Sequence, residues 1–295
     1  MLETLAPALV TGLLLGGLYG AIAVGLSLIF GVIRVINFAH GGFLMAAMYA
    51  SYWGWALLGL DPYLSILVVG PLFFGVGYAA QHLLIRPMFL RERALVVEPL
   101  GVLLLMAGFD LVLSNAALLF FRADYRGVTH PLGAVTFPFL FMDLSVARTL
   151  VFVLALVLTG GLSWLLTHTE LGTAIRSVGQ NREAAALCGV NVYRIYDLTF
   201  GLGTAVLAIT GAAMLPFYYV NPAMGPPLAV KSVLVVVLGG LGSVPGALVG
   251  GLVLGVVESV AAQFVPATAA AIFSFVLFVV VLLTRPRGIM GTLEV

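Results

Sequence analysis

Residues 167–197 read THTELGTAIRSVGQNREAAALCGVNVYRIYD and form the longest polar interval in an otherwise apolar chain. Apolar side chains at helical spacing predict a short helix with one apolar face: Leu171, Ala174, Ile175 and Val178. Asn181 suits the N-cap of a second helix, Glu183 falls in its first turn, and Gly189 suits its end. The interval is therefore predicted to form two short helices joined near residues 179–180.

Three of the thirteen basic residues lie in this interval: Arg176, Arg182 and Arg194. Its local signals fit a structured connector between two apolar segments, and they also fit a docking element for another protein. The composition and order of the remaining chain have to decide between these two interpretations.

The composition of the whole chain indicates a membrane protein. Of its 295 residues, 62% are hydrophobic and 8% are charged, whereas about 25% are charged in an average soluble domain. The mean hydropathy is +1.18. A polar shell cannot be built from this composition, so the expected class is an all-α, polytopic protein embedded in a lipid bilayer. The net charge of +1 gives no indication of a nucleic-acid partner.

Eight to nine apolar helical segments are predicted, at approximately residues 5–33, 43–60, 63–85, 94–121, 149–166, 198–219, 230–238, 247–265 and 267–284. The first segment carries Gly12, Gly16 and Gly20 at a spacing of four, which gives a face of small residues for close helix packing.

The seventh segment is too short to cross a bilayer by itself, because a crossing helix needs about 20 residues. It ends at a break rich in glycine and proline that includes Gly239, Gly240 and Pro245. One broken or re-entrant helix is predicted if this backbone is buried in protein. Two ordinary helices in a tight hairpin are the alternative.

A second interruption follows the first segment and includes Asn37, His40 and Gly41. Asn and His side chains can bond open backbone groups between two helices, and glycine permits close approach. The interruption is interpreted either as a plain loop at the cytoplasmic end of two crossings, or as a gate or a contact with a cytoplasmic partner.

The positions of Lys and Arg predict an N-out, C-in orientation. This orientation places nine basic residues on the inner side and four on the outer side. The polar interval then faces the cytoplasm. Residues 1–295 are expected to form a single transmembrane domain.

No nucleotide, cofactor, metal or catalytic site is expected. The sole lysine, Lys231, lacks the glycine-rich loop that precedes the lysine of a phosphate-binding motif. The four histidines have no Cys, His or Asp at ligand spacing. Three polar residues fall inside apolar segments: Asp110, Asn115 and Glu258. Polar groups at such positions mark either a path for a polar solute or a pairing between helices.

Residues 183–189 read EAAALCG, which fits the EAA-x-x-x-G pattern of the cytoplasmic coupling loop in permeases of ABC importers. Residues 34–41, 171–178 and 238–247 read RVINFAHG, LGTAIRSV and LGGLGSVPGA. Together these stretches resemble the LivH-type permeases of branched-chain amino-acid ABC importers. The similarity extends over about residues 12–288 and is specific as a joint pattern.

The resemblance implies a multi-pass transport subunit of the bacterial inner membrane that is not itself an enzyme. It implies a second, LivM-like permease subunit, two cytoplasmic ABC ATPase subunits that hydrolyse ATP, and a periplasmic solute-binding protein as partners. Residues 168–196 are then the coupling loop. The residues expected to serve the contact with the ATPase are Arg176, Arg182, Glu183, Ala184, Ala185 and Gly189.

The chain departs from the motif of other importers after Gly189. Their loop continues to Ile-x-Leu-Pro, whereas residues 190–194 read VNVYR, so the motif does not fix the detailed coupling geometry. Related permeases carry urea, short amides or aromatic acids, and the sequence does not separate these substrates from branched-chain amino acids. A proton-coupled secondary transporter that uses Asp110 or Glu258 is the alternative from another class.

Overall fold

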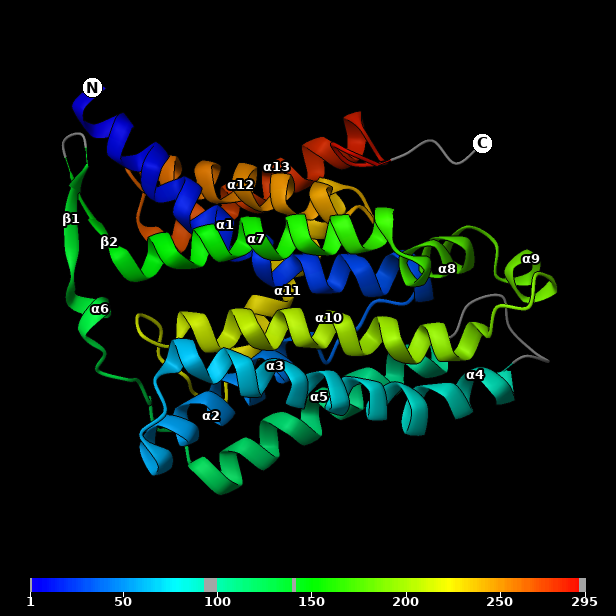
Figure 1. Cartoon of the computed structure of the whole chain (residues 1–295). Helices are drawn as coiled ribbons and strands as arrows, with labels where there is room; N and C mark the ends of the chain where they lie inside the picture. The colour runs from blue at the N-terminus through cyan, green and yellow to red at the C-terminus, as the bar shows by residue number, and fades with distance from the viewer. Residues whose placement is uncertain (1, 93–99, 140–141, 292–295) are drawn as a thin grey trace.

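The computed structural model describes residues 2–92, 100–139 and 142–291, and most of them are helical (Figure 1). The longer helices are α1 (Leu2–Ile33), α2 (His40–Leu58), α3 (Pro62–Ala80), α5 (Leu100–Phe121), α7 (Val146–His168), α10 (Val192–Met214), α11 (Gly225–Gly239), α12 (Val244–Ala261) and α13 (Ala267–Thr284). The shorter elements are η1 (Gln81–Ile85), α4 (Arg86–Glu92), α6 (Pro131–Ala134), β1 (Thr136–Phe139), β2 (Met142–Ser145), α8 (Glu170–Gln180) and α9 (Arg182–Leu187).

The prediction of a helical, multi-pass membrane protein is confirmed at this level. Within the described residues, six helices are long and apolar enough to span a bilayer, namely 5–33, 62–90, 100–121, 146–168, 192–214 and 244–261. Helix α11 is shorter, as its length in the sequence suggested. The expected start of the fourth segment at Ala94, and the basic residue Arg93, lie outside the described residues.

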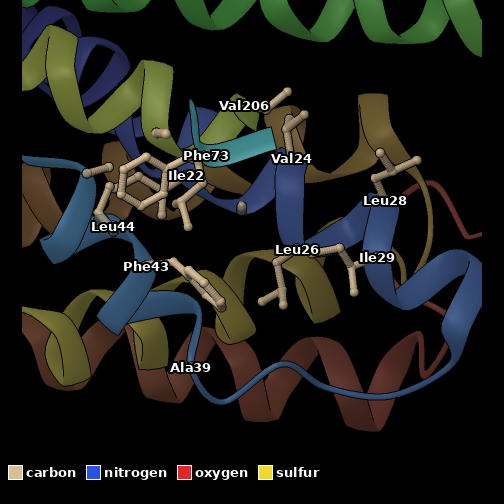
Figure 2. Close-up of a cluster of buried hydrophobic side chains, with 14 of the residues drawn as sticks. Ile22, Val24, Leu26, Leu28, Ile29, Ala39, Phe43, Leu44, Phe73 and Val206 are labelled. Atoms are coloured by element: carbon tan, nitrogen blue, oxygen red, sulfur yellow. The ribbon is translucent and has the colours of Figure 1, made fainter. Parts of the chain in front are cut away.

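Helices α1 and α10 form the centre of the bundle. In each of these two helices, 78% of an apolar stretch of 18 residues is buried within the chain, whereas in α5 only 17% of such a stretch is buried. Figure 2 shows side chains of the central cluster from α1, α2, α3 and α10, among them Ile22, Ile29, Phe43, Phe73 and Val206. Helices α5, α7 and α13 lie at the periphery and expose apolar side chains, as a surface in contact with lipid or with another membrane subunit requires.

Helix α1 packs backbone to backbone against α12. A side chain on Gly16 would come 2.6 Å from the Gly251 carbonyl oxygen, and one on Gly12 would come 2.7 Å from the Val256 Cα atom. Any side chain on Gly255 would overlap the Gly16 backbone. The predicted small-residue face is therefore the contact surface, and its glycines are required because their hydrogen atoms leave room for the opposing backbone.

The two ends of the bundle differ. Figure 1 shows β1, β2 and α6 at one end and α8, α9 and α4 at the other. Strands β1 and β2 form an antiparallel hairpin in which Thr136 pairs with Ser145 and Phe139 with Met142. This hairpin is an exception to the all-helical expectation. Pro138 disfavours a helix here, and a two-stranded hairpin has only edge strands, where proline is tolerated.

A hydrogen-bonded cluster fixes the start of α3 at the hairpin end. Asp61 Oδ1 accepts a hydrogen bond of 2.8 Å from the Tyr63 N–H and so caps α3. His130 Nδ1 accepts from the Leu132 N–H, so His130 Nε2 carries the proton that it donates to Asp61 Oδ2 at 2.7 Å. The cluster ties the connection before the hairpin to the loop between α2 and α3.

We predict that Gly255→Ala lowers the free energy of unfolding by about 1–3 kcal/mol, because the added methyl group forces α1 and α12 apart. Gly160→Ala in α7 is the control, since no described atom beyond its own stretch of helix lies within 4 Å of a side chain built there. Thermal unfolding of both variants in detergent measures the effect. Equal midpoints for the two variants would contradict the close α1–α12 contact.

Candidate functional site: the α8–α9 loop and a buried polar centre

Helices α8 and α9 occupy the polar interval as predicted. Asn181 Oδ1 accepts hydrogen bonds of 3.0 Å from the N–H groups of Glu183 and Ala184 and so caps α9. Gly189 follows α9 with a φ of 85°, a conformation that favours glycine. The predicted cap, first-turn acid and terminating glycine are all confirmed.

The apolar face of α8 packs on the bundle. Ile175 and Val178 are buried, and a side chain on Gly172 would overlap the Leu165 and Leu166 carbonyl groups at the end of α7. Helix α8 is therefore held against the membrane-spanning helices.

Helix α9 projects outward from α8. Five of the six residues expected to serve a contact with an ATPase are exposed: Arg176, Arg182, Glu183, Ala184 and Gly189. Ala185 is buried, at 4% exposure, and packs inward. Leu187, which the sequence did not single out, is 91% exposed at the tip of α9.

The end of α8 is attached to the end of α1. Arg34 adopts an unusual φ of 58° and donates a hydrogen bond of 3.1 Å from Nη2 to the Gly179 carbonyl oxygen. A side chain on Gly179 would come 2.9 Å from the Gly31 carbonyl oxygen, and one on Gly31 would come 2.8 Å from the Gly242 Cα atom. Gly31 is thus the point where α1, α8 and the α11–α12 connection meet.

The interruption after α1 runs back along α1. His40 Nε2 donates a hydrogen bond of 2.9 Å to the Ile22 carbonyl oxygen. Ile22 lies about three turns, or ~16 Å, before the end of α1 at Ile33. Residues 34–39 therefore return into the bundle, and α2 begins partway along α1. His40 and Gly41, which we expected in the interruption, lie in the first turn of α2.

Helix α11 begins beside the start of α2. A side chain on Gly41 would overlap the Gly225 carbonyl group, and one on Gly225 would come 2.9 Å from the Gly41 carbonyl carbon. The N-termini of these two helices therefore meet inside the bundle. The partial positive charge of a helix N-terminus makes this junction favourable for negative charge.

The glycine-rich break lies at the other end of α11. Gly239 is the last residue of α11, Gly240 has a φ of 109°, and Pro245 lies in the first turn of α12. Residues 288–291 cover this break, because the Ile289 and Met290 N–H groups donate to the Leu238 and Gly239 carbonyl oxygens at 2.8 and 2.9 Å. The irregular backbone is thus enclosed by protein.

Asp110 and Asn115 both lie on α5 but face different surroundings. Asp110 points at the first turn of α2, where a side chain on Gly42 would come 2.6 Å from its Oδ1 atom. Asn115 is exposed, and its Nδ2 group donates a hydrogen bond of 2.7 Å to the Leu111 carbonyl oxygen of the same helix. Of the two residues, only Asp110 is brought to the first turn of α2.

Glu258 forms an ion pair with the sole lysine. Lys231 Nζ lies 2.7 and 3.0 Å from the two carboxylate oxygens of Glu258, and it also donates to the Tyr19 hydroxyl group. The ammonium group lies 4.5 Å from the centre of the Tyr19 ring. These contacts join α11, α12 and α1. Glu258 is therefore paired with Lys231 and is not in contact with Asp110 or Asn115.

The sequence reasoning missed Lys231 as a partner because the pair spans separate helices and has no local spacing. It also missed Asp197, the last residue of the polar interval. Asp197 is 1% exposed, and its Oδ2 atom lies 2.9 Å from His82 Nδ1 and 3.8 Å from Arg86 Nη1. This contact ties the first turns of α10 to η1. The available signal was His82, a titratable residue inside the predicted apolar segment 63–85.

We predict that Glu258→Met destabilises the chain by up to about 3–5 kcal/mol, because Lys231 then stays partly buried without its counter-ion. The double variant with Lys231→Met should regain most of the lost stability, since both charges are removed. Thermal unfolding of the single and double variants measures this. Additive losses in the double variant would contradict a structural ion pair.

Within the part of the chain that the structure describes, no three His, Cys, Asp or Glu side chains are grouped so that they could hold a metal ion. The features that stand out are instead six apolar spans, the short capped helix α9 that projects outward from α8, and the helices α2 and α11, whose N-termini meet inside the bundle. These features define a multi-pass, helical membrane protein.

The family model for the permease component of the branched-chain amino acid transport system matches residues 8–284, and the chain belongs to this family. It is 32% identical to the branched-chain amino acid transport system permease protein BraD of Pseudomonas aeruginosa, with 97% of this chain and 96% of that protein covered. It is 29% identical to the corresponding LivH of Salmonella typhimurium, with 96% and 94% covered.

A shorter stretch, 35% of this chain, is 35% identical to the fructose import permease FrcC of Rhizobium meliloti. No solved structure gives a significant match.

Proposed function

We propose that this chain is a transmembrane permease subunit of an ATP-driven importer, which moves branched-chain or related amino acids across the bacterial inner membrane. The observation that carries the proposal is the family match over nearly the whole chain, together with full-length relatives named as branched-chain amino acid permeases. The exposed α9 adds a surface for an energy-supplying partner.

The proposed topology is N-out, C-in with nine helical segments. Helix α1 runs inward, and α2, α3–α4, α5, α7, α10, α11, α12 and α13 then alternate in direction. Helices α2 and α11 are the two segments that begin inside the bundle. The bias of basic residues supports this orientation, as does the position of α8 and α9 at the end opposite the β1–β2 hairpin (Figure 1).

The proposed assembly contains a second, LivM-like permease subunit, two cytoplasmic ABC ATPase subunits and a periplasmic solute-binding protein. Residues 1–295 form one transmembrane domain in this proposal, and residues 168–196 are its coupling loop. The ATPase meets α9, while the binding protein meets the opposite end, where the β1–β2 hairpin lies.

Coupling follows from the attachment of α8. Rearrangement of the ATPase subunits on binding and hydrolysing ATP displaces α9 and, with it, α8. Because the end of α8 touches Gly31 and receives the hydrogen bond from Arg34, the displacement reaches both α1 and the α11–α12 connection. These helices then tilt, and access to the solute switches from the outer to the inner side.

We predict that Glu183→Arg reduces both ATPase co-purification and solute uptake by about tenfold, which corresponds to ~1.4 kcal/mol of lost contact energy. Glu170→Arg is the matched control, because it makes the same charge change in the first turn of α8 and costs the same interaction with the helix dipole. Affinity purification with quantified ATPase measures the effect. Uptake by the chain alone, with no ATPase present, would overturn the importer proposal.

The polar path for the solute is proposed to include Asp110, Asn115 and Glu258. Asp110 has the best support, because its carboxylate faces the first turn of α2, inside the bundle, and can receive a substrate ammonium group. Glu258 belongs to the path only together with Lys231, and Asn115 only where α5 faces the second permease subunit.

We predict that Asp110→Asn, which keeps the side-chain shape but removes the charge, lowers the uptake rate about tenfold or more while the ATPase subunits still co-purify. Radiolabelled leucine uptake into cells or vesicles measures this. If Asp110→Asn, Asn115→Leu and Glu258→Gln together leave both uptake rate and selectivity unchanged, these residues are not the path.

A further inference from the structure

A small cavity lies beside residues 34–39, the re-entrant segment that follows α1. Its walls come from α1, residues 34–39, η1, α5 and α10, and its apolar lining consists of Ile29, Ile33, Val35, Ile85, Val102, Met106 and Phe200. Only Asn37 and Gln81 contribute polar side chains to it. The cavity offers about 10 Å³ to the centre of a water-sized molecule, which is roughly the room that one water needs.

Both amides are buried with unused hydrogen-bonding capacity. Gln81 is 0% exposed and Asn37 is 2% exposed. Asn37 Oδ1 accepts a hydrogen bond of 3.0 Å from the Ala39 N–H and thereby shapes the turn before α2. Asn37 Nδ2, Gln81 Nε2 and Gln81 Oε1 have no partner among the described residues. More than nine in ten buried polar groups in proteins are hydrogen-bonded, so three unpartnered atoms on the two polar residues of one cavity call for a hydrogen-bonding partner there.

The position of the cavity in the fold supports this view. Irregular backbone at membrane depth is tolerated where it is buried in protein or lines a wet cavity, and Asn37 belongs to such a segment. Gln81 is the first residue and Ile85 the last residue of the π-helix η1, and π-helical turns occur frequently at functional sites.

We propose that this cavity is a binding site for a water molecule that bridges the re-entrant segment and the π-helical turn. Water matches the site chemically, since it can accept from Asn37 Nδ2 and Gln81 Nε2 and donate to Gln81 Oε1, which makes the usual three hydrogen bonds of a buried water. No charged side chain lines the cavity, so an ion has no counter-charge there. Any transported amino acid is too large for it.

The site has a consequence for the transport helices. Met106 lines the cavity, and Asp110 lies one helical turn further along the same face of α5. The bound water therefore holds residues 34–39, which precede α2, through hydrogen bonds that can re-form with a new partner. A direct contact of two side chains would instead have to break when the helices move.

A double-variant cycle tests the bridge, because the two amides do not bond each other. Gln81→Met removes one amide at similar volume, and Asn37→Ser removes the Nδ2 donor while keeping an oxygen for the Ala39 N–H. Gln263→Met, on the exposed surface, is the control for Gln81→Met. Midpoints of thermal unfolding are measured on the full chain in the complex in which it purifies.

Each single variant should lower the midpoint by about 2–4 °C, and the double variant should fall by clearly less than the sum. Additive shifts, or a rise on removing either amide, would overturn the proposal, since a dry cavity gains from losing an unpaired amide.

Cryo-electron microscopy at a resolution that shows water, with and without leucine, provides a second measurement. Density for one water within hydrogen-bonding distance of both amides in both samples is expected. Density that appears only with leucine, or no density, would overturn the water site. Neither result bears on whether the chain imports amino acids, because the co-purification and uptake measurements decide that separately.

Discussion

The contact between the backbones of α1 and α12 is the constraint on which the other parts of the structure depend. Gly12, Gly16 and Gly255 carry no side chain, so the two helices touch along their backbones. Between apolar helices in lipid there is little hydrophobic driving force, and close packing supplies the attraction. Because α12 lies so close to α1, α11 is held against the bundle, and the ion pair between α11 and α12 reaches Tyr19 of α1.

Helix α1 also organises the breaks in the other helices. His40 bonds to the Ile22 carbonyl and so fixes where α2 begins, while Gly31 meets the connection between α11 and α12. Two helices that start inside the bundle need partners for their first N–H groups, and their meeting point favours negative charge. The carboxylate of Asp110 lies beside the first turn of α2. The unbonded N–H groups at the start of an interrupted helix are thus placed beside a carboxylate, and a transporter can use both for a polar solute.

In our proposal, the displacement of α8 and α9 by the ATPase subunits also reaches α1. Helix α8 is held by its apolar face and by Arg34, while α9 stays exposed, with Leu187 at its tip. One part of the loop is thus rigidly attached to the bundle, and the other part is free to bind a partner. A loop that was exposed throughout would bind a partner without moving α1, and a loop that was buried throughout would bind none.

The sequence by itself determined the class of fold, the two short capped helices and the glycine face of α1, because hydropathy, caps and small-residue spacing act over one or two helical turns. It also located the break at Gly239–Pro245. Only the tertiary structure decided that α2 begins partway along α1, that Glu258 pairs with Lys231, and that Asp110 faces α2. These features join residues that are far apart in the chain, and their partners are set by how the helices pack rather than by any local pattern.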